Sequence, residues 1–145
     1  MNLNHMLCFQ IAKTHQLFNR FYKRPLSRFH LTYVQYIVLI ALWGKDGVTV
    51  NQLSARVSLN NGTLTPLLKR LQRAGWIDRK RDHHDERRVI ITLTPQGHKK
   101  QRDILNSTQS CMTTLNYSAA NYRKTIAEVK DIQRRLRKSM RSYSK

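Results

Sequence analysis

The segment 49–93 constrains the fold more than any other part of the chain, because it combines two short helices with a hairpin. Thr49 followed by Gln52 is a capping box and predicts the start of a helix. After a link over residues 58–62, a second helix is predicted to end at Gly75, since glycine suits a helix C-terminus. The apolar stripe of this helix has helical spacing and consists of Leu64, Leu67, Leu68 and Leu71. The pair predicts a helix-turn-helix.

The residues after this pair predict a β-hairpin. Its flanks, 76–81 and 87–93, alternate in polarity and hold β-branched residues, and the polar stretch 82–86 between them predicts a turn. Thr94, followed by a proline, then predicts the start of a helix that we expect to reach about residue 115. A helix-turn-helix followed by such a hairpin predicts a winged helix.

Further helices are predicted on both sides of this segment. Residues 4–23 show helical apolar spacing, and Pro25 is expected to end that helix. Thr32 opens a second capping box, and its apolar helix is expected to reach Trp43. A last helix begins near residue 119, and its apolar face holds Tyr122, Ile126, Val129, Ile132, Leu136 and Met140. The expected fold class is mainly α with a small β-hairpin wing, a winged helix-turn-helix.

The charge balance indicates an anionic partner. The 145 residues suit one domain, and their 27 Lys and Arg against 8 Asp and Glu give a net charge of +19. Such a chain repels itself unless nucleic acid or an acidic membrane surface neutralises it. The apolar run 36–43 has eight residues, too few to span a bilayer, and the first residues do not resemble a secretory signal. We therefore expect a cytoplasmic protein, without a membrane partner, whose Cys8 and Cys111 are reduced.

The predicted winged helix has a polar and cationic side that suits DNA. An α-helix fits the major groove, and a thin cationic hairpin can reach into the minor groove. The candidate DNA-binding residues are Asn61, Thr63, Thr65, Lys69 and Arg70 on the second helix and Arg87 and Arg88 on the hairpin. Further cations accompany them, namely Arg73, Arg79, Lys80 and Arg81. Any one of these basic residues could simply belong to a solvent-exposed charged face. A basic hairpin directly after a capped helix pair nevertheless favours DNA binding.

No metal, cofactor or catalytic site is predicted. His83 and His84 stand between Asp82 and Asp85, but adjacent ligands on a loop cannot easily converge on one ion. The sequence contains no Gly-rich phosphate loop and no nucleophile–His–acid arrangement. We therefore expect a binding protein rather than an enzyme, the enzymatic alternative being a thiol peroxidase that uses Cys8.

Four stretches of this sequence resemble the MarR family of bacterial regulators. Residues 85–94 look like the D-x-R…L-T signature of that family's wing. Residues 62–71, 7–9 and 31–36 are closer to one branch, the organic-hydroperoxide-sensing repressors of the OhrR type. The resemblance covers about residues 6–100, and beyond them only the helix pattern is similar.

The resemblance implies a single MarR-type domain over residues 1–145 that forms a homodimer. Residues 30–100 would be the winged-helix DNA-binding lobe, and helices in 1–24 and 101–145 would hold the two subunits together. The two lobes would then read a pseudo-palindromic operator in double-stranded DNA.

One position departs from this branch. The family places the arginine that matches Arg87 in the minor groove, and the branch usually has Asp where this chain has Asn60. Asn can still cap a helix but cannot form an ion pair with a wing arginine, so the orientation of the wing is left open.

The resemblance also identifies Cys8 as a peroxide sensor whose sulfur is hydrogen-bonded by Tyr22 and Tyr33. Cys8 lies in the first turns of a helix, where the helix dipole favours the thiolate that peroxide oxidises. Tyr22 follows Cys8 by 14 residues, which is about 21 Å along one helix, so the tyrosines would have to come from the partner subunit. Cys111 could resolve the oxidised Cys8, a small thiol could do so instead, or Cys111 could have no redox role.

The chain is thus predicted to be a repressor that leaves its operator when organic hydroperoxide oxidises Cys8. Two alternatives remain open: a regulator of the same fold that responds to a small phenolic ligand, and a nucleoid-type protein that binds DNA through charge. The last twelve residues, 134–145, hold six cations and no acid. We expect this tail to add salt-sensitive affinity for DNA without sequence preference.

Overall fold

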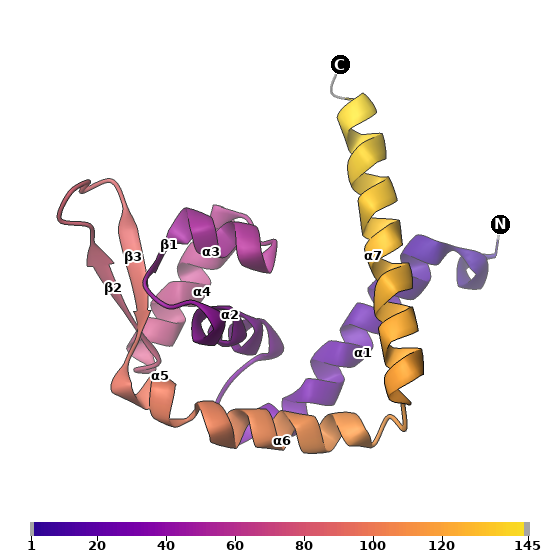
Figure 1. Ribbon diagram of the computed structural model, residues 1–145, viewed down its shortest axis with the longest axis horizontal. Coiled ribbons are helices and arrows are strands. Elements are labelled where there is room, and N and C mark those ends of the chain that lie inside the picture. Colours follow the sequence, from indigo (N-terminus) through magenta and orange to yellow (C-terminus); the bar gives the residue numbers. More distant parts are fainter. Residues whose placement is uncertain (1, 144–145) are drawn as a thin grey trace. The chain divides into compact units, whose positions relative to one another are not determined.

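The computed structural model describes residues 2–143 and consists of helices with one small sheet (Figure 1). The elements that precede the winged helix are a 3-10 helix, η1 (Leu3–His5), and α1 (Leu7–Ser27). The winged helix consists of α2 (Tyr33–Gly44), β1 (Val48–Thr49), α3 (Val50–Val57), α4 (Asn61–Arg73), β2 (Ile77–Arg81) and β3 (Val89–Leu93). The remaining helices are α5 (Pro95–Lys99), α6 (Gln101–Thr113) and α7 (Ala119–Ser142).

The chain divides into two compact units. The first extends to Cys111 and contains the winged helix together with α1, α5 and most of α6. The second begins at Met112 and contains the end of α6 and the whole of α7. Within residues 2–143, no helix combines the length and the apolar character needed to cross a membrane. The assignment of the terminal helices to dimerisation stays a prediction.

Side-chain caps begin the helices where the sequence predicts. Thr32 and Thr49 each form a complete capping box with a glutamine three residues later. Asn60 accepts a hydrogen bond of 2.8 Å from the backbone N–H of Thr63, so α4 begins at Asn61, two residues earlier than expected. The predicted helix-turn-helix is therefore confirmed.

The core of the winged helix lies between α2, α3, α4 and the sheet. Its buried side chains include the four leucines predicted from the stripe on α4, together with Leu39, Leu42, Leu53, Ile77 and Ile91. Gly75 follows α4 with a φ of +77°, which glycine adopts without strain, and this turn directs the chain into β2. Burial of this apolar face, rather than helix propensity, supplies most of the stability of such short helices.

The sheet has three antiparallel strands in the order β1-β3-β2. Figure 1 shows the hairpin of β2 and β3 projecting beyond α2, α3 and α4 as a wing, as the sequence predicts. Ile77 pairs with Leu93 at the base of the wing, and Arg81 pairs with Val89 near its tip. The short strand β1 is an addition, because two residues are too few to show alternation in the sequence.

The expectation that Pro25 ends the first helix is wrong, since α1 continues to Ser27. Proline has no N–H to donate to the carbonyl of Phe21 four residues earlier. That carbonyl faces the thiol of Cys111 on α6 instead, at 4.0 Å from its sulfur. The carbonyl of Pro25 itself accepts a hydrogen bond of 3.1 Å from the hydroxyl of Ser107. Groups on α6 thus satisfy the carbonyls around the proline, and α1 carries on through it.

The long helix expected from Pro95 to about residue 115 consists of two helices. Lys100 separates α5 from α6, and its N–H bonds to the carbonyl of Gln96 at 3.0 Å. The break lets α5 pack against the base of the wing while α6 leads away from it. The start at Thr94 is as predicted, because its hydroxyl accepts from the N–H of Gly97 at 3.1 Å.

Candidate nucleic-acid interface and cysteine sites

The exposed N-terminal end of α4 presents the short polar residues that the sequence singles out. Asn61 and Thr63 are exposed and Thr65 is half-buried, whereas Leu64 and Leu68 point into the core. The side-chain amide of Asn61 donates to the side-chain oxygen of Asn51 on α3 at 2.8 Å. The two helices of the pair are therefore linked at the end where both begin.

A groove of about 420 Å³ joins this end of α4 to the wing. It brings together residues from β1, α3, α4, the turn of the wing and the start of β3, and its lining consists of Thr49, Val50, Asn51, Gln52, Asn61, Thr65, Arg87, Arg88 and Val89. Four predicted DNA-binding residues, Asn61, Thr65, Arg87 and Arg88, thus share one groove. The other three do not line it: Thr63 is exposed in the first turn of α4, and Lys69 and Arg70 are exposed one to two turns further along that helix.

The acidic residues of the wing turn hold its backbone. Asp85 accepts from the N–H of Arg87 at 3.1 Å, and Asp82 accepts from the N–H of His84 at 2.9 Å. The carboxylate of Asp85 also lies 3.6 Å from Nε of Arg88. Because both partners are largely exposed, this ion pair contributes at most about 1 kcal/mol and leaves the Arg88 guanidinium able to exchange partners. The turn therefore presents its arginines outward.

The departure at Asn60 preserves the cap of α4. Its side-chain oxygen caps α4 through Thr63, as an aspartate would, and the wing arginine Arg88 pairs with Asp85 of its own turn. In this chain the wing is held in place by contacts inside its turn and at its base.

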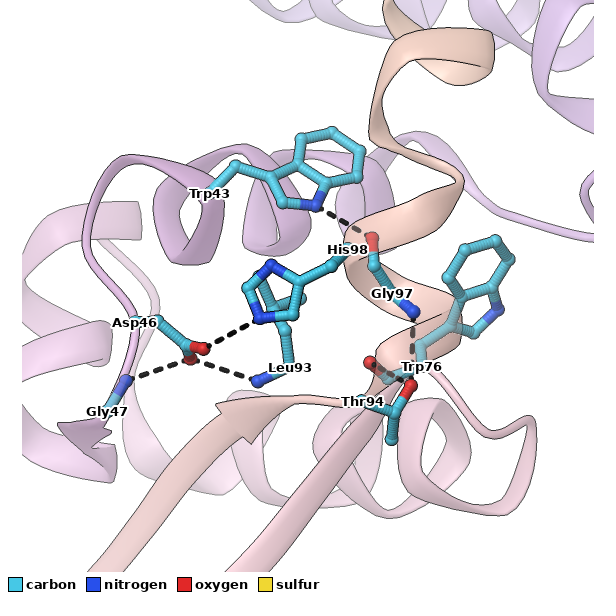
Figure 2. A network of polar contacts seen from close by, with 8 residues as sticks. All are labelled: Trp43, Asp46, Gly47, Trp76, Leu93, Thr94, Gly97 and His98. Carbon is cyan, nitrogen blue, oxygen red and sulfur yellow. Dashed lines mark hydrogen bonds and ion pairs between the residues drawn. The ribbon is translucent and has the colours of Figure 1, made fainter.

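The base of the wing is fastened by Asp46, in the loop before β1 (Figure 2). One oxygen of its carboxylate accepts from the N–H of Gly47 at 2.8 Å and of Leu93 at 2.9 Å. The other oxygen lies 3.3 Å from Nε2 of His98 on α5. A single side chain thus connects the end of α2, the last residue of β3 and α5.

A second set of bonds holds α5 against the same base (Figure 2). The indole N–H of Trp43 donates to the carbonyl of Gly97 at 3.0 Å. The hydroxyl of Thr94 lies 2.6 Å from the carbonyl of Gly75 and 3.2 Å from that of Trp76. Since α6 follows α5 almost directly, these contacts also fix where α6 begins relative to the wing.

Cys8 lies in the first turn of α1, and its side chain is exposed. The apolar side chains of Leu7 and Ile11 beside it are 59% and 44% exposed, so the thiol belongs to an uncovered apolar surface. In a single chain the sulfur is therefore open to solvent.

The structure brings the two predicted tyrosines together but away from Cys8. The rings of Tyr22 and Tyr33 stack with centroids 4.8 Å apart, and Tyr36 lies 5.7 Å from Tyr22. Tyr22 is about 21 Å along α1 from Cys8, so within one chain neither tyrosine meets that sulfur. Tyr36, which the sequence did not single out, bonds through its hydroxyl to Thr108 of α6 at 3.0 Å.

Cys111 is half-buried and lies beside the same aromatic cluster. Its sulfur is 4.0 Å from the carbonyl of Phe21, whose ring meets that of Tyr22 edge-on at 5.5 Å. Phe21 is 13 residues beyond Cys8, which is about 20 Å along α1. A disulfide needs Cα atoms within about 7 Å, so the two cysteines of one chain cannot join while α1 is intact.

Besides Tyr36, the residues Asn51, Gln52 and Asp46 contribute to these sites but were not predicted as site residues from the sequence. Asn51 and Gln52 line the groove because they form the first turn of α3, and their place directly after the capping residue Thr49 is a signal that could have identified them. Asp46 gave no such signal, because its partners Leu93 and His98 are distant in sequence.

Comparison with known proteins gives a family and two relatives. The family model "Transcriptional regulator SarA/Rot" matches residues 20–105. The HTH-type transcriptional regulator TtmR of Methylorubrum extorquens is 43% identical over 114 residues, which are 77% of this chain and 58% of that protein. The organic hydroperoxide resistance transcriptional regulator of Bacillus subtilis is 40% identical over 97 residues, 67% of this chain and 66% of the relative. The chain thus spans less than two thirds of each of these relatives.

Solved structures agree with the winged-helix fold. Reduced AbfR bound to DNA superposes with a TM-score of 0.86 at 34% identity, over 95% of this chain and 94% of that one, and AbfR is a protein of Staphylococcus epidermidis. A disulfide-formed state of AbfR superposes with a TM-score of 0.68 at 35% identity, over 90% and 91% of the two chains. MarR superposes with a TM-score of 0.75 at 22% identity, over 89% of this chain and 98% of MarR, which bears on the fold alone. The chain therefore belongs to the SarA/Rot family of transcriptional regulators and has the winged-helix fold of MarR.

Proposed function

We propose that this regulator binds its operator as a reduced homodimer and leaves it when an organic hydroperoxide oxidises Cys8. The observation that carries the proposal is the exposed thiol of Cys8, set in the first turn of α1 among uncovered apolar side chains. The similar Bacillus regulator is named for organic hydroperoxide resistance, and AbfR has both a reduced, DNA-bound form and a disulfide form.

The groove between α4 and the wing supports a specific mode of DNA binding. The N-terminal end of α4 would enter the major groove, where Asn61 and Thr63 could meet base edges. Arg87 would follow the backbone into the minor groove, whose negative potential attracts arginine. Asn51 would act as a positioning residue, because its side-chain oxygen holds the amide of Asn61.

A second copy of the chain would cover the exposed apolar residues of α1 and α7. On α1 they include Leu7, Ile11 and Leu17, and on α7 they include Ile126, Val129, Leu136 and Met140. A monomeric protein rarely leaves so many large apolar side chains uncovered. A dimer would also place two wings for two half-sites of a pseudo-palindromic operator.

The proposed chemistry begins with the Cys8 thiolate. Its sulfur attacks one oxygen of the hydroperoxide, an S–O bond forms, the O–O bond breaks, and the alcohol leaves after taking up a proton. The sulfur is oxidised to sulfenic acid while the peroxide is reduced. A second thiol can then attack the sulfenic sulfur, forming a disulfide and releasing water.

Cys111 of the partner subunit is the proposed second thiol. Because Cys8 and Cys111 of one chain are about 20 Å apart along α1, we expect every Cys8–Cys111 disulfide to join two chains. Oxidation with stoichiometric cumene hydroperoxide should give a covalent dimer on a non-reducing gel, and mass spectrometry should identify the mixed peptide. Cys8→Ser and Cys111→Ser variants should both stay monomeric on that gel. A bridge found within single chains, or a dimer that forms without Cys111, would refute this assignment.

Arg87→Gln is expected to weaken DNA binding roughly tenfold, or about 1.4 kcal/mol, because the variant loses a cation that faces the groove. Fluorescence anisotropy with the tightest duplex selected from a random-sequence library would measure the effect. Lys99→Gln is the matched control, since Lys99 is exposed on α5 and does not line that groove. Equal losses in the two variants would show that Arg87 acts only through net charge.

A pocket in the first unit favours a second candidate function, the response to a small aromatic acid. It has a volume of about 570 Å³ and is lined by Arg28, Phe29, His30, Trp76, Gln96, Lys100 and Asp103. Lys100 pairs with Asp103 at 3.7 Å, so Arg28 is the cation that would meet an aromatic carboxylate. Its guanidinium lies 4.7 Å from the centre of the Phe29 ring. Release of a Cys8→Ser variant from DNA by benzoate would select this function over peroxide sensing.

A further inference from the structure

The helix α7 carries a straight row of cations along one side. Arg123, Lys130, Arg137 and Arg141 are all exposed, and at 3.6 residues per turn they fall within about 40° of one another around the helix. From the first to the last, the row is about 27 Å long. Among residues 2–143, no carboxylate lies within ion-pair distance of these four side chains.

The other cations of α7 are arranged differently. Arg134 and Arg135 both pair with Asp131, whose two carboxylate oxygens each take one guanidinium. The hydrogen bonds from Arg135 and from Arg134 hold the pKa of Asp131 below its usual value. Two of the cations expected in the tail 134–145 are therefore partly neutralised within the helix, whereas the row begins eleven residues before that tail. Lys145 lies outside the described residues.

We propose that the row on α7, residues Arg123, Lys130, Arg137 and Arg141, is a second DNA-binding surface that contacts backbone phosphates without reading sequence. This inference rests on the proposed DNA-binding function, and it assigns to α7 a role separate from that of α4 and the wing. Duplex DNA carries one negative charge per about 1.7 Å of its axis, so a straight row of this length faces many phosphates at once.

The composition of α7 favours DNA over an anionic membrane. A helix that lies in a membrane interface inserts an apolar face with Trp, Phe or Leu between lipid tails. The apolar face of α7 contains one leucine, Leu136, and neither Trp nor Phe. It is interrupted by Gln133, and its far edge holds Glu128. The cations of the row border that face along one edge only, as suits a helix that covers its apolar side with protein and leaves its cations to a linear polyanion.

The test compares two variants of the full-length protein that lose the same charge. Lys130→Gln with Arg137→Gln removes one lysine and one arginine from the row. Lys124→Gln with Arg135→Gln removes the same pair of residue types from a side of α7 about 100° or more away from the row. Glutamine has a helix propensity close to that of lysine and arginine, so both variants should keep their circular dichroism spectrum and melting temperature.

The measurement is the salt dependence of binding to a random-sequence duplex of about 40 base pairs, roughly four helical turns. Each phosphate contact contributes about 0.9 to the slope of log K against log salt, so the row variant should lose about 2 from that slope per bound chain. The control variant should lose less than half as much. The ratio of affinities for the selected and the random duplex should stay constant in both, because phosphate contacts carry no sequence information.

The possible failures are distinguishable. If Arg87→Gln weakens binding while the row variant keeps the slope of the unmodified protein, the second surface is refuted and the proposed function stands. Equal losses in the row and control variants refute the row as a defined surface. If only binding to vesicles of phosphatidylcholine and phosphatidylserine depends on Lys130 and Arg137, a membrane surface replaces DNA. If the unmodified protein binds neither duplex, the proposed function fails as well.

Discussion

A Cys8→Ser variant is expected to bind the selected duplex with unchanged affinity and to remain bound after addition of organic hydroperoxide. Serine keeps the size and the exposed position of the side chain but has no sulfur to oxidise. Coupling between two sites in a protein typically amounts to about 1–3 kcal/mol, so the unmodified protein should lose about 5- to 150-fold in DNA affinity on oxidation. The DNA affinity of the Cys8→Ser variant should fall by less than about twofold after the same treatment.

The physical reason lies in the surroundings of Cys8. Its neighbours Leu7 and Ile11 are apolar and exposed, so in a dimer the thiol would sit in or beside a covered apolar surface. A sulfenic acid or a disulfide at that position changes the fit of α1 against its partner. The change can reach the wing, because Ser107 and Cys111 hold α6 to α1, and the contacts of Asp46 and Trp43 hold α5 to the winged helix.

Fluorescence anisotropy before and after stoichiometric cumene hydroperoxide measures this effect. Cys111→Ser is the informative companion, because it keeps the sensor and removes the proposed resolving thiol. It should still respond to peroxide, but dithiothreitol should restore its binding less completely than that of the unmodified protein, since an unresolved sulfenic acid oxidises further. Peroxide-induced release of the Cys8→Ser protein would end the sensing model.

A Gly97→Ala substitution is expected to destabilise the winged helix by about 1–3 kcal/mol or more. Gly97 is buried in α5, and a Cβ atom there would lie 2.5 Å from the backbone carbonyl oxygen of Trp76 and 3.1 Å from a methyl group of Leu93. The carbonyl cannot rotate away, because the N–H of Thr94 bonds to it at 3.1 Å. The helix α5 must therefore move, and the bond from Trp43 to the Gly97 carbonyl must lengthen.

Urea denaturation of the two glycine variants Gly97→Ala and Gly44→Ala provides the measurement and its control. Gly44 is the last residue of α2, and a Cβ atom there would meet nothing within 4 Å. Alanine at this helical position should stabilise the protein by up to about 1 kcal/mol. If Gly97→Ala were as stable as the unmodified protein, α5 would not be tightly fastened to the wing, and the proposed route from α6 to the DNA-binding face would lose its basis.

The sequence predicted those parts of the fold that depend on neighbours in the chain. The capping boxes at Thr32 and Thr49 and the cap at Thr94 each join residues three apart, so their residue types alone indicate where a helix begins. The leucines of α4 and the alternating flanks of the wing were also predictable from the sequence, because apolar residues recur with the period of a helix or of a strand. These local signals also predicted that the candidate DNA-binding residues lie on the second helix of the pair and on the wing.

The tertiary structure decided what depends on distant partners. The helix α1 passes through Pro25 because groups 82 and 90 residues away, on Ser107 and Cys111, meet the carbonyls around it. Asp46 secures the wing through an N–H bond that spans 47 residues, and no local pattern reports such a contact. The cation row on α7 was partly visible as charge, but only the pairing of Asp131 with Arg134 and Arg135 separated it from its neutralised neighbours. Local hydrogen bonds are fixed by residue type and spacing, whereas long-range contacts exist only once the core has packed and brought their partners together.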